Sequence, residues 1–346
     1  MTTTTTSPAP TPSEHRLAEI LALTRRVLEP GLRSAVKSLP QPLRLMADYH
    51  FGWCDAQGRP AQGYMGKRLR PALAVSSCIA CGGLPESAAP AAIAAELIHN
   101  FTLLHDDVMD GDIIRRGRST VWALWGIPDA VLLGDSLHAL AAEVLAMRLS
   151  PPAVGPAVER LESTVIELCR GQHEDCLAEG RNQPTIGDCE RTAISKTGAL
   201  MGCACALGAL CAGAPQKTIS ALDRFGRELG AAFQLVDDLI GIWGDPTLCG
   251  KPAGDLMRKK YTMPVVAALM SGTDAAAELK QLYHSPYPLS SAQIVRAAEL
   301  AKAAGACRWT RKQVDRRIEN ALHCLPDHTA NGDLVVLARL IGRRNI

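Results

Sequence analysis

Hydrophobic positions recur along this chain with the period of a helix. From Ser13 onward, apolar residues are spaced three and four apart, beginning with Leu17, Ile20 and Leu21, and they therefore share one helix face. Runs in which Val, Ile and Thr strictly alternate with polar residues, which are typical of half-buried strands, are absent. Turns that contain Gly, Pro or Asp separate most of the segments. The pattern predicts an all-α fold.

The predicted helices are numerous enough for one large bundle. One helix follows Pro71 and ends at Gly82-Gly83, and the others are expected at 91–110, 128–149, 153–180, 186–213, 218–243, 263–271, 292–304, 308–324 and 332–342. No segment after the N-terminus has the composition of a linker. We therefore predict a single helical domain over residues 16–346, with a short tail before it.

The tail, residues 1–15, begins with the low-complexity stretch MTTTTTSPAPTP. Such a composition offers too little apolar surface to order itself, so we predict disorder. Two interpretations stay open. The tail is either inert, or it is a docking peptide for a partner or a protein shell.

Composition narrows the compartment and the partners. The 346 residues carry a net charge of +2, which gives no whole-protein reason to expect nucleic acid or an anionic membrane as a partner. The twelve cysteines lie mostly in apolar contexts, and no secretory signal precedes them, so we predict a reduced cytoplasmic setting. Cys78 and Cys81 form a lone CxxC, which is weak evidence for zinc. The uncharged stretch 197–217 is less apolar than a membrane span and predicts a core helix.

Candidate chemistry begins in the segment 96–118, read as ELIHNFTLLHDDVMDGDIIRRGR. Asp106 and Asp110 are four residues apart and share one helix face, with Asp107 about 100° to the side. Like charges at this spacing destabilise an isolated helix by a few tenths of a kcal/mol. Mg²⁺ suits such a site, because it takes one or two carboxylates and completes its shell with water and phosphate oxygens. A solvated acidic helix end is the alternative.

A second acidic pair, Asp237 and Asp238, recurs about 130 residues later in the apolar run FQLVDDLIG. Each aspartate would cost several kcal/mol if it were buried without a partner. Two such helices facing each other would form a carboxylate-lined cavity for several divalent ions. Cationic residues in apolar or glycine-bearing contexts accompany them: Lys67, Arg70, Arg115, Arg116, Lys196, Lys251 and Lys260. Acidic and basic clusters together predict a site for diphosphates, which metals, arginines and lysines neutralise.

These segments form an ordered set of motifs between about residues 60 and 325. They are GKRLRP at 66–71, ELIHNFTLLHDDVMD at 96–110, RRG at 115–117, LLGD at 132–135, GQHED at 171–175, KT at 196–197, FQLVDD at 233–238, GDPTLCGKP at 244–252 and KYTMP at 260–264. In their order and spacing the chain resembles the trans-polyprenyl diphosphate synthases, the farnesyl and geranylgeranyl diphosphate synthase family.

The resemblance implies an all-α bundle with a deep central cavity, usually dimeric, that condenses isopentenyl diphosphate with an allylic diphosphate and releases pyrophosphate. It implies up to three Mg²⁺ ions, for which Mn²⁺ can substitute, on the aspartates of the two acidic motifs: Asp106, Asp107, Asp110, Asp237 and Asp238. It assigns the allylic diphosphate to Arg115, Lys196, Lys251 and Lys260. It assigns the diphosphate of isopentenyl diphosphate to Lys67, Arg70, His99 and Arg116. The carbonyl of Lys196 or Thr197, with Gln234, would face the developing cation.

Three departures from the family pattern stand out. The second acidic motif ends in Gly241, where many members have aspartate, although we expect activity to survive because the third metal is bound mainly through Asp237. Ser119 and Trp122 follow RRG where Pro and His are common. The segment 254–256, read as GDL, is one residue shorter than usual, which loosens the alignment of the basic run at 258–260.

Both the length of the product and the function itself have alternatives. Phe101 lies five residues before Asp106, roughly 7.5 Å along the helix axis, so its ring can block the growing product, or it is ordinary core packing. We predict geranylgeranyl diphosphate first and farnesyl diphosphate second.

A class I terpene cyclase is a competing function, but it needs no second diphosphate site. A non-catalytic subunit or shell cargo is another, and loading into a protein nanocompartment through the tail is compatible with catalysis.

Overall fold

The computed structural model describes residues 12–61, 63, 66–178, 184–244 and 254–342. Its helices are α1 (Pro12–Lys37), α2 (Leu43–His50), α3 (Leu69–Ala80), η1 (Pro85–Ala88), α4 (Ala89–Met109), α5 (Val121–Trp125), α6 (Ile127–Arg148), α7 (Pro151–Ala178), α8 (Ile186–Ala193), η2 (Ile194–Gly198), α9 (Ala199–Cys211), α10 (Gln216–Trp243), α12 (Gly254–Met257), α13 (Met263–Leu269), α14 (Asp274–His284), α15 (Ser291–Ala303), α16 (Ala306–Cys324) and α17 (Gly332–Gly342). The predicted all-α class is confirmed.

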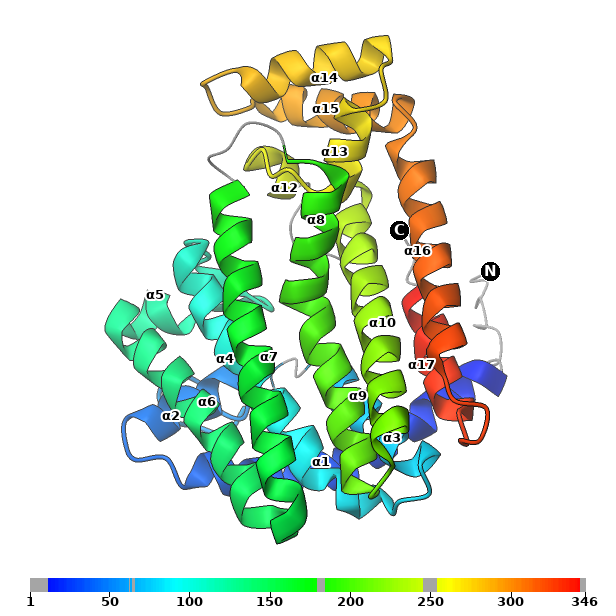
Figure 1. Cartoon of the computed structure of the whole chain (residues 1–346). Helices are drawn as coiled ribbons and strands as arrows, with labels where there is room; N and C mark the ends of the chain where they lie inside the picture. The colour runs from blue at the N-terminus through cyan, green and yellow to red at the C-terminus, as the bar shows by residue number, and fades with distance from the viewer. Residues whose placement is uncertain (1–11, 62, 64–65, 179–183, 245–253, 343–346) are drawn as a thin grey trace, which may run out of the picture.

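The long helices form a bundle around α9 (Figure 1). Every residue of α9 from Ala199 to Ala209 is buried, because α3, α4, α7 and α10 pack around it. Helices α3 and α9 contribute to both of the large hydrophobic clusters, one with α1, α4, α6 and α7 and the other with α10, α16 and α17. The hairpin α14–α15 crosses one end of the bundle over a smaller cluster of its own (Figure 1).

Four glycines bring η2 and α9 into backbone contact with α10. A Cβ atom added at Gly230 would lie 2.5 Å from the Cα of Gly198, and one at Gly226 would lie 2.7 Å from the Cα of Gly202. Each pair is spaced four residues apart on its own helix, so the two glycine faces fit together over one turn. This glycine seam (Gly198, Gly202, Gly226 and Gly230) holds Thr197 beside α10.

A short β-hairpin follows α4, which the sequence pattern did not predict. Strands β1 (Ile114–Arg115) and β2 (Arg118–Ser119) are joined by Arg116 and Gly117, both at positive φ (54° and 75°), as in a two-residue type I′ turn. The hairpin is anchored to α2, because the Tyr49 hydroxyl donates to the carbonyl of Ser119 at 2.8 Å. Arg118 in turn donates to the carbonyls of Tyr49 and Cys54.

Several boundaries differ from the prediction. Helix α1 begins at Pro12, so residues 12–15, which were assigned to the tail, form its first turn; residues 1–11 lie outside the description. Helices α2, α5, α12 and α14 were not predicted. The predicted helix 186–213 is divided by a π-helical turn, η2, at Lys196 and Thr197.

Within the described part of the chain, two helices are long and apolar enough to cross a membrane by length and composition alone. The most apolar 18-residue window is 78% buried in Ile186–Cys211, as in the core helix of a bundle, and 44% buried in Ile127–Arg148. Cysteines among the described residues are free thiols, and burial raises the pKa of Cys78 to about 12. Cys78 is thus a protonated core residue that donates to the carbonyl of Leu84.

Candidate active site

A cavity of about 810 Å³ opens in the bundle between α3, α4, α7, η2 and α10. Its walls include apolar residues such as Leu168, Phe233 and Ile341. Eleven of the predicted site residues line it: Lys67, Arg70, His99, Phe101, Asp106, Arg115, Arg116, Lys196, Thr197, Gln234 and Asp237. Residues up to 170 positions apart in the sequence therefore surround one space.

Aspartates from the two acidic motifs face this cavity from opposite helices. Asp106 lies in the last turn of α4, and Asp237 lies two turns before the end of α10. Burial raises the pKa of Asp106; Lys196 opposes the shift, and Asp110 adds to it. Carboxylates held in such surroundings favour a nearby cation. Asp110 itself caps the C-terminus of α4 and is half-buried beside the cavity.

The second aspartate of each motif points away from the cavity. Asp107 is 2% exposed and accepts a hydrogen bond from Arg115 Nε at 2.6 Å. Burial raises the pKa of Asp107 to about 6, although Arg115 opposes the shift. Asp238 accepts from Gln234 Nε2 at 2.9 Å and from the backbone N–H of Met263 at 3.2 Å, and burial raises its pKa to about 7. Both are predicted metal ligands, and in this structure each carboxylate is hydrogen-bonded to neighbouring groups.

The hairpin turn sets the two arginines of RRG. Arg115 is tied to Asp107 and also lines the cavity, while Arg116, at positive φ, projects into the cavity from the turn. Because Arg116 adopts the left-handed region beside Gly117, the side chains of Arg115 and Arg116 can reach the same cavity from two directions. The acidic motif thus positions a cation as well as offering carboxylates.

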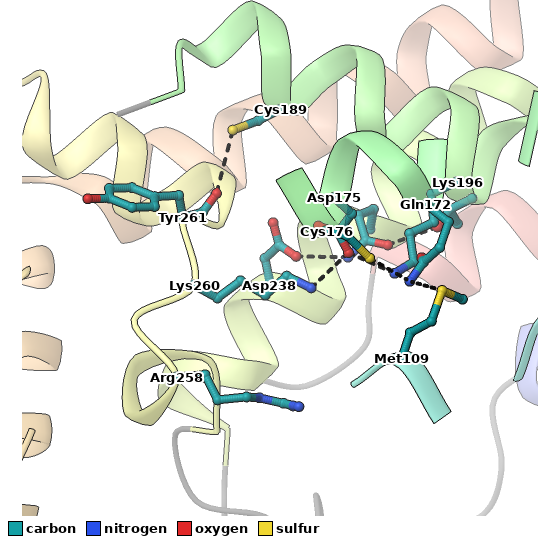
Figure 2. A network of polar contacts seen from close by, with 12 residues as sticks. Met109, Gln172, Asp175, Cys176, Cys189, Lys196, Asp238, Arg258, Lys260 and Tyr261 are labelled. Atoms are coloured by element: carbon teal, nitrogen blue, oxygen red, sulfur yellow. Dashed lines mark hydrogen bonds and ion pairs between the residues drawn. The ribbon is translucent and has the colours of Figure 1, made fainter. Parts of the chain in front are cut away.

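Asp175 is the last residue of the GQHED motif, and the sequence analysis assigned it no role of its own. Its Oδ2 accepts from Lys196 Nζ at 2.7 Å and from Lys260 Nζ at 2.9 Å (Figure 2). Burial would raise the pKa of Asp175, but the two lysines hold it below its usual value. Lys196 comes from η2 and Lys260 from the segment after α12. Their contact with the same carboxylate depends on the fold, so motif spacing along the sequence could not predict it.

Of the three basic residues at 258–260, Lys260 is the one at the lysine pair. Arg258 Nη1 bonds Asp112 at 3.3 Å instead. Lys259 Nζ donates to the carbonyls of Ser285 and Tyr287. The alignment that the shortened segment left open is therefore resolved by geometry. Lys251, predicted at the same site, lies outside the described residues.

The π-helical turn η2 sets a polar relay beside the lysines. Thr197 Oγ1 donates to Gln234 Oε1 at 2.8 Å, and Gln234 Nε2 donates to Asp238. The amide of Gln234 is therefore held between α10 and η2 with its orientation fixed at both ends. Single π turns often occur at functional sites, because they redirect a few side chains within a helix.

The basic side of the cavity comes from the GKRLRP loop and α4. Arg68, at positive φ, turns inward to a buried ion pair with Glu96, which leaves its neighbour Lys67 lining the cavity. Arg70 is half-buried, and its Nε atom is buried with no hydrogen-bond partner among the described residues. Burial, with the nearby arginines, lowers the pKa of His99 well below its usual value, so this histidine is neutral. An anion with several acceptor oxygens fits this side.

Phe101 forms part of the apolar wall below Asp106. Its ring stacks on His138 of α6 at 5.4 Å between centroids and meets His105 edge-on at 4.8 Å. His138 is fixed in turn by Glu162 at 2.8 Å. Phe101 is therefore held by two rings, of which His105 also lines the cavity.

Comparison with known proteins identifies the family. A family model described as polyprenyl synthetase matches residues 56–300. A geranylgeranyl diphosphate synthase of Mycobacterium tuberculosis is 50% identical over 94% of this chain and 93% of its own length. A (2E,6E)-farnesyl diphosphate synthase of Mycobacterium bovis is 40% identical over 89% and 86%. The crystal structure of a polyprenyl synthetase from Streptomyces coelicolor has a TM-score of 0.89 at 41% identity and covers 94% of this chain and 99% of its own.

The matched region includes both acidic helices, the hairpin arginines and the lysine pair on Asp175. Because the match spans more than half of the chain, and relatives align over nearly all of it, the chain belongs to the polyprenyl synthetase family.

Proposed function

We propose that this prenyltransferase condenses isopentenyl diphosphate with an allylic diphosphate in a Mg²⁺-dependent reaction, and that its main product is geranylgeranyl diphosphate. One observation carries the proposal. A single cavity is lined both by Asp106 and Asp237 and by Lys67, Arg70 and Arg116. Two charged regions in one apolar space provide for two diphosphates at once.

The acidic side fits Mg²⁺. Asp106, Asp110 and Asp237 would hold the ions, with Mn²⁺ as a substitute, and phosphate oxygens and water would complete each shell. Among the described residues, no group of three or more His, Cys, Asp or Glu side chains is placed to hold a metal ion by itself. Bound Mg²⁺ supplies charge neutralisation to the leaving pyrophosphate.

The chain's own cations would divide between the two substrates. Lys196 and Arg115 line the cavity, and their charges act on Asp106. They would hold the allylic diphosphate together with Lys251 and with Lys260, which shares Asp175 with Lys196. The buried Nε of Arg70 lacks an acceptor among the described side chains, and a second diphosphate would provide one. Lys67, His99 and Arg116 would bind the same group, with His99 as a neutral hydrogen-bond donor.

Neutral dipoles and apolar walls would handle the carbocation. Gln234, held by Thr197 and Asp238, can present its amide oxygen to developing positive charge. The walls, which include Leu168 and Phe233, keep water away from the allylic cation. Attack by the double bond of isopentenyl diphosphate and loss of a proton complete the step without a nucleophilic side chain.

Product length is set by the wall at Phe101. The ring is 7% exposed and backed by His105 and His138, so it cannot easily withdraw from a growing chain. Similarity to a geranylgeranyl synthase at 50% identity and to a farnesyl synthase at 40% supports the same order of products.

The test is to incubate the purified chain with Mg²⁺, labelled isopentenyl diphosphate and each allylic starter, and to size the products by chromatography. We expect a C20 diphosphate, no product after chelation of the metal, and loss of turnover in Asp106→Asn. A cyclic hydrocarbon formed from geranyl diphosphate alone would instead identify a class I terpene cyclase.

We also infer a homodimer formed through α5, α6 and α7. Large apolar side chains on these helices are exposed: Ile127 at 52%, Leu132 at 56%, Met147 at 77% and Ile166 at 72%. Exposed apolar area of this kind marks interaction sites. Light scattering should give twice the mass of one chain, and Leu132→Glu together with Ile166→Glu should reduce it to one.

The chain is proposed to act in the cytoplasm, with residues 1–15 as a docking segment for a protein nanocompartment. The composition of the segment supports this, and removal of residues 1–11 should leave turnover intact while abolishing association with a shell. Loss of turnover on removal would contradict a purely targeting role.

A further inference from the structure

The end of the second acidic motif contains an unusually close approach. A Cβ atom added at Gly241 would lie 2.4 Å from Oδ2 of Asp255 and 3.2 Å from its Cγ. The carboxylate of Asp255 therefore fills the volume that the first atom of any side chain at position 241 would need. A side chain at position 241 would therefore displace the Asp255 carboxylate from this place.

The contact places that carboxylate on α10, less than one and a half turns after the acidic pair. Gly241 follows Asp237 by four residues in α10, so the two positions share one helix face, one turn apart. A carboxylate seated against Gly241 is thus on the same face as Asp237. Asp238, three residues before Gly241, borders the same face; Asp255 adds to the rise in its pKa, and its carboxylate is bonded to Gln234 and to the backbone of Met263.

Asp255 is also within the field of the site's charges. It is half-buried in the first turn of α12, where the charges of Lys260, Arg258, Asp175 and Asp110 act on it. Two of these are already engaged, because Lys260 Nζ bonds Asp175 and Arg258 Nη1 bonds Asp112. The backbone N–H of Lys260 donates to the carbonyl of Asp255 at 2.8 Å, which couples the position of Asp255 to that of Lys260.

We propose that Asp255 supplies, from α12, the carboxylate that the second acidic motif lacks at Gly241, and that it helps to hold the metal-bound diphosphate beside Asp237. The two departures of this sequence from its family, the glycine at 241 and the shortened segment 254–256, are then one exchange. The shorter segment carries Asp255 to α10, and the glycine makes room for it. The inference rests on the proposed function, because it concerns the same metal-bound diphosphate.

A different role for Asp255 must be separated from this one. An acidic residue in the first turn of a helix interacts favourably with the helix dipole, whatever its neighbours. Asp274 occupies the same position in α14, is exposed and lies in the hairpin that crosses the end of the bundle. Asp274→Asn is therefore a matched control for Asp255→Asn.

The experiment measures binding of inorganic pyrophosphate by calorimetry, with and without Mg²⁺, in the full-length chain. Asp255→Asn keeps the side-chain volume and removes the charge, so we expect Mg²⁺-dependent affinity to fall about tenfold, as for other groups that orient metal ligands. Gly241→Asp should lose more affinity than Asp255→Asn, because the new carboxylate and that of Asp255 would need the same volume. The exchange variant Gly241→Asp with Asp255→Ser should recover to within about threefold of the parent, by the same reasoning.

Each outcome decides between the claims. Absence of Mg²⁺-dependent pyrophosphate binding in the parent chain would overturn the proposed function itself. Binding by the parent with unchanged affinity in Asp255→Asn, or an equal loss in Asp274→Asn, would overturn the role of Asp255 alone. If the exchange variant is folded by circular dichroism but does not recover, the idea of one exchange is wrong. If it does not fold, Asp255→Asn against its control decides.

Discussion

The glycine seam should be sensitive to a single methyl group. In Gly230→Ala the new Cβ would lie 2.5 Å from the Cα of Gly198 and 3.0 Å from the carbonyl oxygen of Thr197. The first distance is 0.9 Å less than the 3.4 Å at which ordinary contact begins. Both neighbours are backbone, so η2 and α10 must separate by nearly that amount.

Two effects on stability oppose each other. Overpacking of a tight core costs about 1–3 kcal/mol, whereas replacing glycine by alanine within a helix gains about 1 kcal/mol. Because backbone cannot rotate away as a side chain can, we expect the upper end of the cost and a net loss of about 2 kcal/mol. Displacement of Thr197 by nearly 1 Å also stretches its 2.8 Å bond to Gln234, and turnover should fall by up to about 100-fold.

Chemical denaturation and steady-state turnover would measure both effects. Gly187→Ala in α8 is a suitable control, since its Cβ would meet its nearest atoms at 3.7 and 3.8 Å, and it should gain about 0.5–1 kcal/mol without loss of turnover. If Gly230→Ala is as stable and as active as the parent, the helices are not in backbone contact and the reasoning fails.

Three further predictions follow from single contacts. Phe101→Ala should lengthen the product and cost about 3 kcal/mol of stability, as large core truncations do; chromatography with an unchanged product distribution would mean that Phe101 is not the stop. Asp175→Asn should destabilise the free chain by about 2–3 kcal/mol, because two lysines lose a charged acceptor. In thermal unfolding, added pyrophosphate should stabilise this variant more than it stabilises the parent chain. Equal stabilisation of the variant and the parent would contradict the pairing. Burial lowers the pKa of His50 to about 3, so the unfolded chain takes up a proton there between pH 6.5 and 3 that the folded chain does not, and stability falls on acidification; His50→Gln should flatten that slope by up to about 1.4 kcal/mol per pH unit, and an unchanged slope would mean that His50 is not buried neutral.

The helical period predicted most of the long helices because their burial is periodic. Helix α4 was expected at 91–110 and spans Ala89–Met109, and α16 was expected at 308–324 and spans Ala306–Cys324. The hairpin escaped prediction because it depends on Arg116 in the left-handed region and on long-range bonds to Tyr49. Neither feature has a local apolar pattern.

The site was predictable where the motif carries it and less so where the fold does. Spacing identified Asp106 and Asp237, which line one cavity, but it grouped Asp107 and Asp238 with them. Asp107 and Asp238 each follow the cavity-lining aspartate by one residue, which is a rotation of about 100° around the helix. Their carboxylates therefore point away from the cavity, where Arg115 and Gln234 bind them. Sequence alone cannot tell which of two adjacent carboxylates faces the cavity when both lie in an apolar helix.

The shared contact of Lys196 and Lys260 with Asp175 has a consequence for turnover. One carboxylate cannot cancel two ammonium ions, so the trio keeps a surplus of one positive charge that draws in an anion. After the reaction, the same carboxylate is a resident alternative partner for both lysines. If the two lysines hold the diphosphate as proposed, departing pyrophosphate leaves both of them paired with Asp175, and its release is easier for that reason.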